Sequence, residues 1–218
     1  MLRSLGDALA SSVGKKIVMG TTGLLLVVFL IGHLSGNLPL LPAVDPTGEA
    51  FDEYVEFLNG FGPLKLAAEF GLIALFGVHI FLAIRLTLEN REARKQRYVV
   101  RNNRGASTMA STSMFVTGSL LLAFMIKHLI DFRFNEAFHE DPAATVGATL
   151  ASPISGLIYT AAAVVAGVHV SHGFRSLFQS VGVSHPSWNP ILSVTGKAIS
   201  ALVAVGFGGI ALYFLLVR

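Results

Sequence analysis

The sequence contains no cysteine among its 218 residues. This absence excludes an iron-sulfur cluster ligated by thiolates of the chain, a cysteine nucleophile and a haem attached through a C-x-x-C-H motif. The chain also lacks a glycine-rich dinucleotide-binding motif, so it offers no Rossmann-type nucleotide site. The redox state of its compartment stays undecided, because the chain has no thiol to indicate it.

Charged residues are also scarce. Only 13% of the residues are charged and 53% are hydrophobic, whereas roughly a quarter are charged in a typical soluble domain. Runs without any charged residue cover residues 17–44, 105–126, 142–174 and 198–217, and each can contain a membrane-spanning helix of about 20 residues. A fifth candidate, residues 64–88, carries charge mainly at its ends. We therefore predict an integral membrane protein.

Prolines and polar residues set the expected limits of the helices. We expect an all-α bundle of five transmembrane helices, at about residues 15–38, 63–90, 107–133, 152–181 and 189–217. These helices use the whole chain, so we predict a single domain over residues 1–218 and no separate soluble domain.

The distribution of charge predicts the orientation. The N-terminal segment and the connection between the second and third helices are basic, whereas residues 45–56 and 136–141 carry acidic groups. By the positive-inside rule the N-terminus is cytoplasmic and the C-terminus lies outside, in the inner (cytoplasmic) membrane of a cell. The net charge of +3 thus indicates membrane orientation and not nucleic-acid binding. The basic residues are Arg3, Lys15, Lys16, Arg85, Arg91, Arg94, Lys95, Arg97, Arg101 and Arg104.

Histidines recur inside the expected helices. His33 lies 17 residues after Lys16, or about 25 Å along a helix, so it is near the outer side. His128 lies at a similar depth in the third helix. His79 and His169 each precede by six residues an arginine at the inner end of their helices. The four histidines therefore form two layers, with one pair toward each membrane surface.

A motif around the inner histidines is repeated. Residues 77–85 read "GVHIFLAIR" and residues 167–175 read "GVHVSHGFR". The glycine two positions before each histidine either lets a flat macrocycle approach the backbone or serves simple helix packing. Arg85 and Arg175 lie about 120° around their helices from the histidines. They either reach haem propionates at the inner surface or extend to the membrane interface.

The two layers suit a known chemical need. A b-type haem with two axial imidazoles must lie between helices that carry histidines at equal depth. A single histidine in a membrane helix is more often packed and hydrogen-bonded to a neighbouring helix, but four histidines at two matched depths favour two haems.

Three stretches together resemble a known family. They are "GKKIVMGTTGLLLVVFLIGHLSGNL", "GVHIFLAIRLTLENREARKQRY" and "HVSHGFRSLFQSVG". Over nearly the whole chain they resemble the di-haem cytochrome b membrane anchor of succinate dehydrogenase and fumarate reductase, the five-helix type with one anchor polypeptide. The resemblance implies that His33 and His128 bind a distal haem and that His79 and His169 bind a proximal haem.

The resemblance also implies a function. A flavoprotein subunit with FAD oxidises succinate, an iron-sulfur subunit passes electrons to the proximal haem, and the distal haem exchanges them with a quinone, of which menaquinone is favoured. The anchor would carry the haem and quinone sites but would not itself act on succinate. The direction of the physiological reaction stays open.

His172 and Gly167 require separate interpretation. The family signature H-x-x-x-G-x-R fits only when it is counted from His169, so His172 is expected to form a hydrogen bond, with a haem propionate as one candidate. Relatives that move compensating protons carry a glutamate two residues before this ligand. Here that residue is Gly167, which puts such a proton pathway in doubt.

Two residues are candidates for a quinone site. Glu69 lies ten residues before His79, about 15 Å along the helix and therefore at the depth of the outer histidines. It either accepts a proton from a quinol or is a carboxylate placed at a helix N-terminus. Lys127 would contact a quinone oxygen or a distal haem propionate.

Two other classes of protein stay open. The chain could anchor a different quinone-linked redox complex, such as a hydrogenase or formate dehydrogenase, which would share haem binding but not the family motifs. A histidine-lined proton or metal transporter would need no haem.

Overall fold

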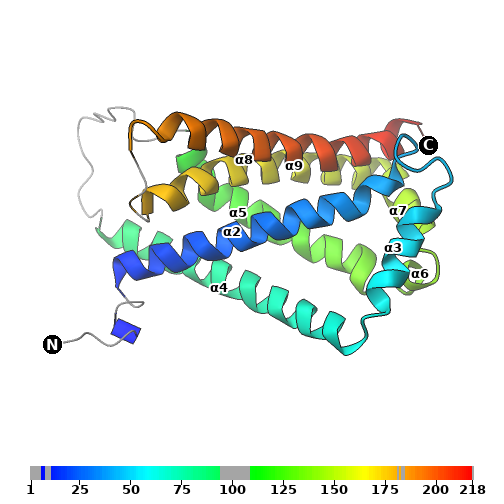
Figure 1. Cartoon of the computed structure of the whole chain (residues 1–218), viewed down its shortest axis with the longest axis horizontal. Helices are drawn as coiled ribbons and strands as arrows, with labels where there is room; N and C mark the ends of the chain where they lie inside the picture. The colour runs from blue at the N-terminus through cyan, green and yellow to red at the C-terminus, as the bar shows by residue number, and fades with distance from the viewer. Residues whose placement is uncertain (1–5, 8–10, 94–108, 181, 183–184, 218) are drawn as a thin grey trace.

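The computed structural model describes residues 6–7, 11–93, 109–180, 182 and 185–217. These residues form helices joined by turns, and five helices are long and apolar enough to cross a membrane. The expected all-α architecture with five such helices is thus confirmed. In Figure 1 the start of α2 and the end of α9 lie at opposite ends of the bundle. The long helices are α2 (Ser12–Asn37), α4 (Pro63–Ala93), α5 (Met109–His128), α8 (Pro153–Ser180) and α9 (Asn189–Val217).

Capping groups and prolines fix most helix starts close to the expected positions. The side chain of Ser11 caps α2 by accepting a hydrogen bond from the Gly14 amide at 3.0 Å. Proline opens α4 and α8, because the first turn of a helix leaves its amide groups unpaired in any case. The expected start of the third long helix at residue 107 and the expected end of the fourth at residue 181 lie outside the described residues.

The third long helix, α5, is shorter than predicted, because the sequence analysis expected one α-helix up to residue 133. It ends at His128, and Leu129–Arg133 continue as a π-helix, η2. The Phe134 amide donates to the Leu129 carbonyl at 2.9 Å, which is the wider spacing of a π-turn. The wider turn begins directly after a candidate haem ligand.

Three short helices cover the outer end of the bundle, where we predicted only connections. They are α3 (Glu49–Asn59), α6 (Glu136–Glu140) and α7 (Pro142–Ala151). The carboxylate of Asp52 on α3 accepts a hydrogen bond from the Ala143 amide at 2.9 Å, which joins α3 to the start of α7. The apolar run 142–174 is divided because Ser152 adopts an extended conformation before Pro153.

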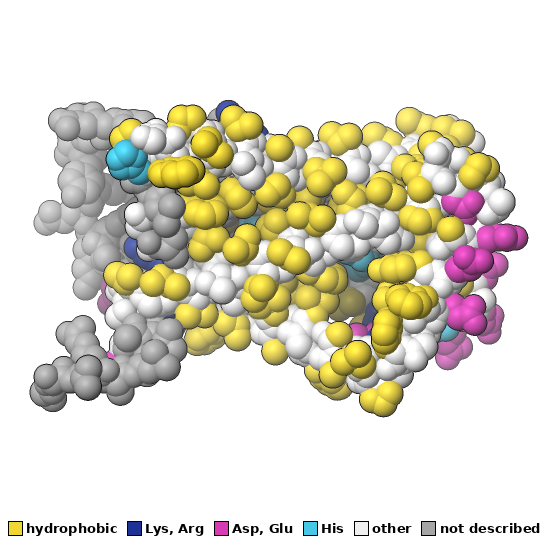
Figure 2. Space-filling model, viewed as in Figure 1, with side chains coloured by type: hydrophobic (Ala, Val, Ile, Leu, Met, Phe, Trp, Pro, Cys, Tyr) yellow, Lys and Arg dark blue, Asp and Glu magenta, His cyan; other side chains and the backbone are white. Residues whose placement is uncertain are grey.

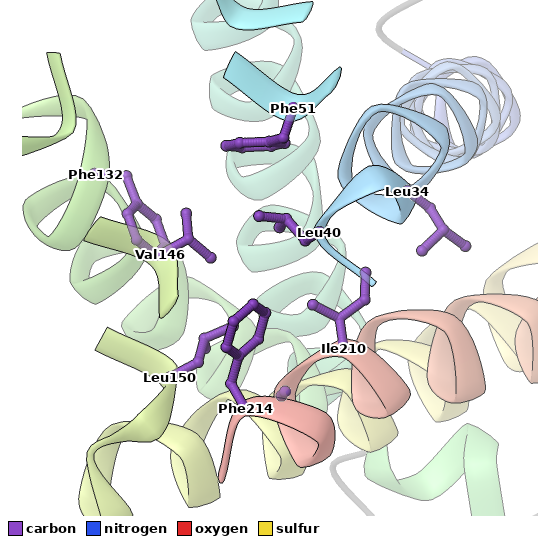
Figure 3. Packing of buried hydrophobic residues seen from close by; sticks show 9 residues of the cluster. Leu34, Leu40, Phe51, Phe132, Val146, Leu150, Ile210 and Phe214 are labelled. Carbon is purple, nitrogen blue, oxygen red and sulfur yellow. The ribbon is translucent and has the colours of Figure 1, made fainter. Parts of the chain in front are cut away.

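The hydrophobic core lies at this outer end (Figure 3). Its side chains come from α2, α3, α7, α9, the π-helix η2 and the short 3-10 helix η1 (Leu38–Leu40). The core contains Leu34, Leu40, Phe51, Phe132, Val146, Leu150, Ile210, Ala211 and Phe214. Most of the remaining helix surface is exposed and apolar, as expected for helices surrounded by lipid.

The histidine-bearing helices are arranged around an interior. Helix α2 packs against α4 and α8, and α5 packs against α8. Helices α2 and α5 are therefore diagonal to each other, as are α4 and α8. The fifth helix, α9, packs along α8, where Ser200 donates to the Gly167 carbonyl at 2.6 Å. Small residues allow this close approach of two membrane helices.

Acidic side chains gather at the end that carries α3, α6 and α7 (Figure 2). This end corresponds to the side predicted to lie outside the cytoplasm. The residues Arg3, Arg94, Lys95, Arg97, Arg101 and Arg104 on which the orientation also rests lie outside the described residues.

Candidate haem sites in the bundle

The outer histidine pair consists of His33 and His128. His33 lies near the C-terminal end of α2, and His128 is the last residue of α5. Their ring centroids are 5.8 Å apart and their planes are inclined by 89°. The two histidines that the sequence analysis assigned to one layer thus face each other across the bundle.

Aromatic rings enclose the outer pair. Phe29, one turn before His33, stacks on its ring at 5.5 Å with an interplanar angle of 12°. The other neighbours lie between 5.2 and 6.0 Å from one of the two imidazoles. They are Phe207 beside His33, and Phe124, Phe132 and Tyr159 beside His128. The sequence analysis did not assign these aromatic residues to a site.

The inner histidine pair consists of His79 on α4 and His169 on α8. Their ring centroids are 6.4 Å apart and their planes are inclined by 70°. The Nδ1 atom of His79 lies 3.1 Å from the Thr22 hydroxyl on α2. The Nδ1 atom of His169 lies 3.1 Å from the Thr117 hydroxyl on α5. Each inner histidine therefore has a threonine on the adjacent helix.

A glycine follows each of these threonines and adjoins the same imidazole. A Cβ atom added at Gly23 would lie 3.3 Å from Cε1 of His79, and one added at Gly118 would lie 3.4 Å from Cε1 of His169. The sequence signal was present, because a Thr-Gly pair ends ten residues before His33 on α2 and ten residues before His128 on α5. We missed it because neither residue type suggests a haem ligand by itself.

The contacts of Gly23 and Gly118 also measure the distance between the layers. Each glycine lies at the level of an inner histidine, and ten residues of the same helix lead to an outer histidine. Ten helical residues span about 15 Å. The two histidine pairs are thus separated by about half the thickness of a bilayer.

The repeated glycines of the two GVH motifs do not share one role. A Cβ atom at Gly167 would lie 2.8 Å from Cβ of Ala204 and 2.9 Å from the Ser200 carbonyl, so Gly167 faces α9. The interpretation that it clears space for a macrocycle is wrong, since helix packing requires the glycine. A Cβ atom at Gly77 would meet nothing within 4 Å among the described residues.

The candidate propionate contacts lie on α4 and α8, toward the inner side of the histidines. Arg85 is exposed, and its Nε donates a hydrogen bond to the Glu89 carboxylate at 3.1 Å. The same carboxylate accepts a hydrogen bond from Nζ of Lys15 on α2 at 2.5 Å. Arg175 is exposed, and His172 is half-buried one turn after His169. Contact of these residues with propionates stays a prediction.

The candidate quinone residues form ion pairs at the outer level. Oε2 of Glu69 lies 3.0 Å from Nη2 of Arg133, and its Oε1 lies 3.7 Å from Nζ of Lys65. Nζ of Lys127 lies 2.7 Å from Oδ2 of Asp131. The same carboxylate oxygen accepts a hydrogen bond from the Tyr159 hydroxyl at 2.7 Å. Each candidate is therefore positioned by an oppositely charged partner, and a quinone contact stays a prediction for both.

The paired imidazoles fit the geometry of bis-histidine ligation. A metal-imidazole bond is about 2 Å long and the ring centroid lies about 1 Å beyond the nitrogen, so two imidazoles on one metal have centroids about 6 Å apart. Both measured separations, 5.8 and 6.4 Å, are close to this value. Moreover, Nδ1 of His128 is buried and has no hydrogen-bond partner among the described residues, which is rare for a side chain that serves packing alone.

The comparison with protein families agrees with this arrangement. The sequence model of the succinate dehydrogenase/fumarate reductase transmembrane subunit matches residues 87–210, more than half of the chain. The chain belongs to this family, and it is a membrane-anchor subunit of succinate dehydrogenase or fumarate reductase. The matched range includes His128 and His169 but not His33 or His79. Searches against curated proteins and against solved structures gave no match.

Proposed function

We propose that this anchor binds two b-type haems and passes electrons between an iron-sulfur subunit and a membrane quinone. His79 and His169 would hold the proximal haem, and His33 and His128 the distal haem. The partners would be an iron-sulfur subunit and a flavoprotein subunit with FAD, and the complex would reside in the inner (cytoplasmic) membrane. Menaquinone is the favoured quinone.

One observation carries the proposal. Four histidines from four helices form two facing pairs, with ring centroids 5.8 and 6.4 Å apart, and about 15 Å of helix separates the pairs. In both pairs the histidines lie on diagonal helices, so they meet across the interior instead of along a packed interface. When bound, a b-type haem supplies a one-electron ferric/ferrous couple.

The chain's own groups have defined tasks in this function. The imidazoles would hold iron, and the aromatic rings around His33 and His128 would exclude water from the outer site. Glu69 would accept a proton at its carboxylate when a quinol is oxidised and return it when a quinone is reduced. Lys127, next to His128 and paired with Asp131, would polarise a quinone oxygen. Arg85, Arg175 and His172 would contact propionates.

The proposal is tested by the haem content of the purified complex. We expect two b-type haems per anchor chain in the parental complex. Alanine variants of His33 and His128 should lose the same haem, and alanine variants of His79 and His169 should lose the other. The matched control is His185→Ala, which removes a histidine in the connection between α8 and α9 and should keep both haems.

Two outcomes would reject the proposal. A complex without a reducible b-type spectrum would favour an anchor that binds no haem. Loss of the same haem in His33→Ala and His79→Ala would contradict the pairing by layers. Co-purification of flavoprotein and iron-sulfur subunits tests the proposed partners.

A further inference from the structure

Thr22 and Thr117 occupy equivalent places beside the two inner histidines. Each is 7% exposed, and they are the two buried polar side chains in the described part of the chain. Each hydroxyl lies 3.1 Å from Nδ1 of one imidazole. Water has little access to either contact, so the hydrogen bonds of these hydroxyls are set by the protein.

The direction of both hydrogen bonds follows from the backbone. A threonine hydroxyl has one hydrogen to donate and can accept two hydrogen bonds. Thr22 donates to the Met19 carbonyl at 2.9 Å, and Thr117 donates to the Ser113 and Met114 carbonyls at 3.1 and 3.2 Å. A carbonyl oxygen can only accept. With the hydroxyl hydrogen donated to these carbonyls, each threonine accepts the hydrogen bond from its histidine.

This direction determines the tautomer of the imidazole. If Nδ1 carries the hydrogen and donates it to the threonine, Nε2 of the neutral ring keeps its lone pair. The lone pair of Nε2 is what a metal ligand needs, and a hydrogen bond from the opposite nitrogen fixes the ring and makes it a stronger donor. The adjacent Gly23 and Gly118 leave room for the rings, with Cβ positions 3.3 and 3.4 Å from the Cε1 atoms.

The outer histidines lack this arrangement. Nδ1 of His128 has no hydrogen-bond partner among the described residues. Nδ1 of His33 lies 3.5 Å from the amide nitrogen of Asn37, which donates to the His33 carbonyl at 2.7 Å. An amide nitrogen cannot accept a hydrogen bond. The hydroxyl acceptors are thus specific to the inner pair.

We infer that Thr22 and Thr117 are positioning residues that fix the Nδ1–H tautomer of His79 and His169 and thereby favour the ferric state of the proximal haem. This inference rests on the proposed haem ligation and adds the electronic control of one of the two sites. A hydrogen bond that Nδ1–H donates to an acceptor increases the electron donation of the ring, which stabilises the more highly charged iron.

The test is a redox titration of the intact complex with Thr22→Val and Thr117→Val, which keep the side-chain shape and remove the hydroxyl. Loss of such a partner typically weakens ligation about ten-fold or more. A ten-fold loss of preference for ferric iron raises a one-electron midpoint potential by about 59 mV. We expect this rise at the proximal haem, a changed low-spin ferric electron paramagnetic resonance signal, and no change at the distal haem.

Conservative and matched variants complete the test. Thr22→Ser and Thr117→Ser retain the hydroxyl and should keep the parental potential. Thr160→Val removes a hydroxyl whose one hydrogen bond among the described residues is to the Gly156 carbonyl, at 2.8 Å, and should also leave the potential unchanged. If a valine variant loses the proximal haem while the serine variant retains it, the inference is equally supported.

The inference is overturned if the valine variants leave the proximal potential unchanged, if the serine variants behave like the valine variants, or if Thr160→Val produces the same shift. These results differ from failure of the proposed function, which would appear as a parental complex without two haems or as a proximal haem that survives His79→Ala.

Discussion

The inner and outer histidine pairs have similar separations but different surroundings. Threonine hydroxyls and glycines adjoin the inner imidazoles, whereas aromatic rings enclose the outer imidazoles. Lys127 directly precedes His128, and its partner Asp131 follows His128 by three residues. Arg85, the nearest ion-paired group after His79 on α4, lies six residues farther along, about 9 Å away.

The difference fits the two different tasks that we propose for these sites. Hydrogen bonds to the ring nitrogens act on the metal through its ligands, which suits a site that only relays electrons. Ionisable groups beside the outer pair can instead exchange protons with a bound molecule, which suits the site where a quinone reacts. The following predictions test this division, starting with the largest expected effect.

Glu69→Gln should abolish most of the quinone reaction and leave the succinate-to-dye reaction and both haems intact. The lost proton acceptor should reduce quinone turnover by about 100-fold or more. The matched control is Arg133→Gln, which breaks the same 3.0 Å ion pair but keeps the carboxylate. If Arg133→Gln causes an equal loss, the ion pair and not the carboxylate is required. Quinone turnover at the parental rate in Glu69→Gln would refute the assignment.

Phe132→Ala should loosen the outer site and spare the inner one. Phe132 is 9% exposed and contacts the rings of His128, Phe138 and Tyr159, so its truncation should cost about 3–5 kcal/mol. We expect a lower melting temperature and loss of the distal haem before the proximal haem on heating, followed by absorption spectroscopy. Phe134→Ala, at a position that is 73% exposed, should change neither. Simultaneous loss of both haems in Phe132→Ala would argue against independent sites.

Alanine at the two GVH glycines should separate helix packing from haem clearance. Gly167→Ala places a methyl group against Ala204 and the Ser200 carbonyl, and such overpacking costs about 1–3 kcal/mol. Gly77→Ala meets no described atom within 4 Å, so any loss of proximal haem in this variant would indicate that the glycine accommodates the haem itself. Thermal unfolding and haem content measure the two effects. Gly209→Ala on α9, also without a described neighbour within 4 Å, is the control.

The sequence predicted the five helices and the pairing of His33 with His128 and of His79 with His169, because both follow from position along a helix. Hydrophobic length sets the spans, and a rise of about 1.5 Å per residue sets the depth of each histidine. Contacts between helices were not predictable in the same way. Gly167 could have faced a haem or α9, and only the packing of α8 against α9 decides between them.

The parts that the sequence analysis missed depend on tertiary context. The short helices α3 and α7 at the outer end of the bundle are shorter than a membrane span. The search for long apolar runs therefore did not detect them. The threonines beside the inner histidines are ordinary helix residues until the neighbouring helix places an imidazole next to them. The π-turn after His128 likewise has no signature in residue type alone.

The smallest expected effect concerns the start of the short helix α3 at the outer end of the bundle, far from the inner histidine pair. The hydroxyl of Thr47 and the backbone amides of Ala50 and Thr47 donate hydrogen bonds to Asp45, which lowers the pKa of this carboxyl below its ordinary value. Because the folded-state pKa is lowered, this stabilisation is complete above the unfolded-state pKa and is lost as the pH falls through the folded-state pKa. The protection of the Ala50 amide against hydrogen exchange, relative to the intrinsic exchange rate at each pH, should therefore fall on acidification below about pH 4. In Asp45→Asn this protection should be lower at neutral pH and should lack the acid-dependent step, while both haem spectra stay unchanged. Protection of Ala50 that does not change with pH in the parental chain would show that Asp45 does not stabilise the start of α3.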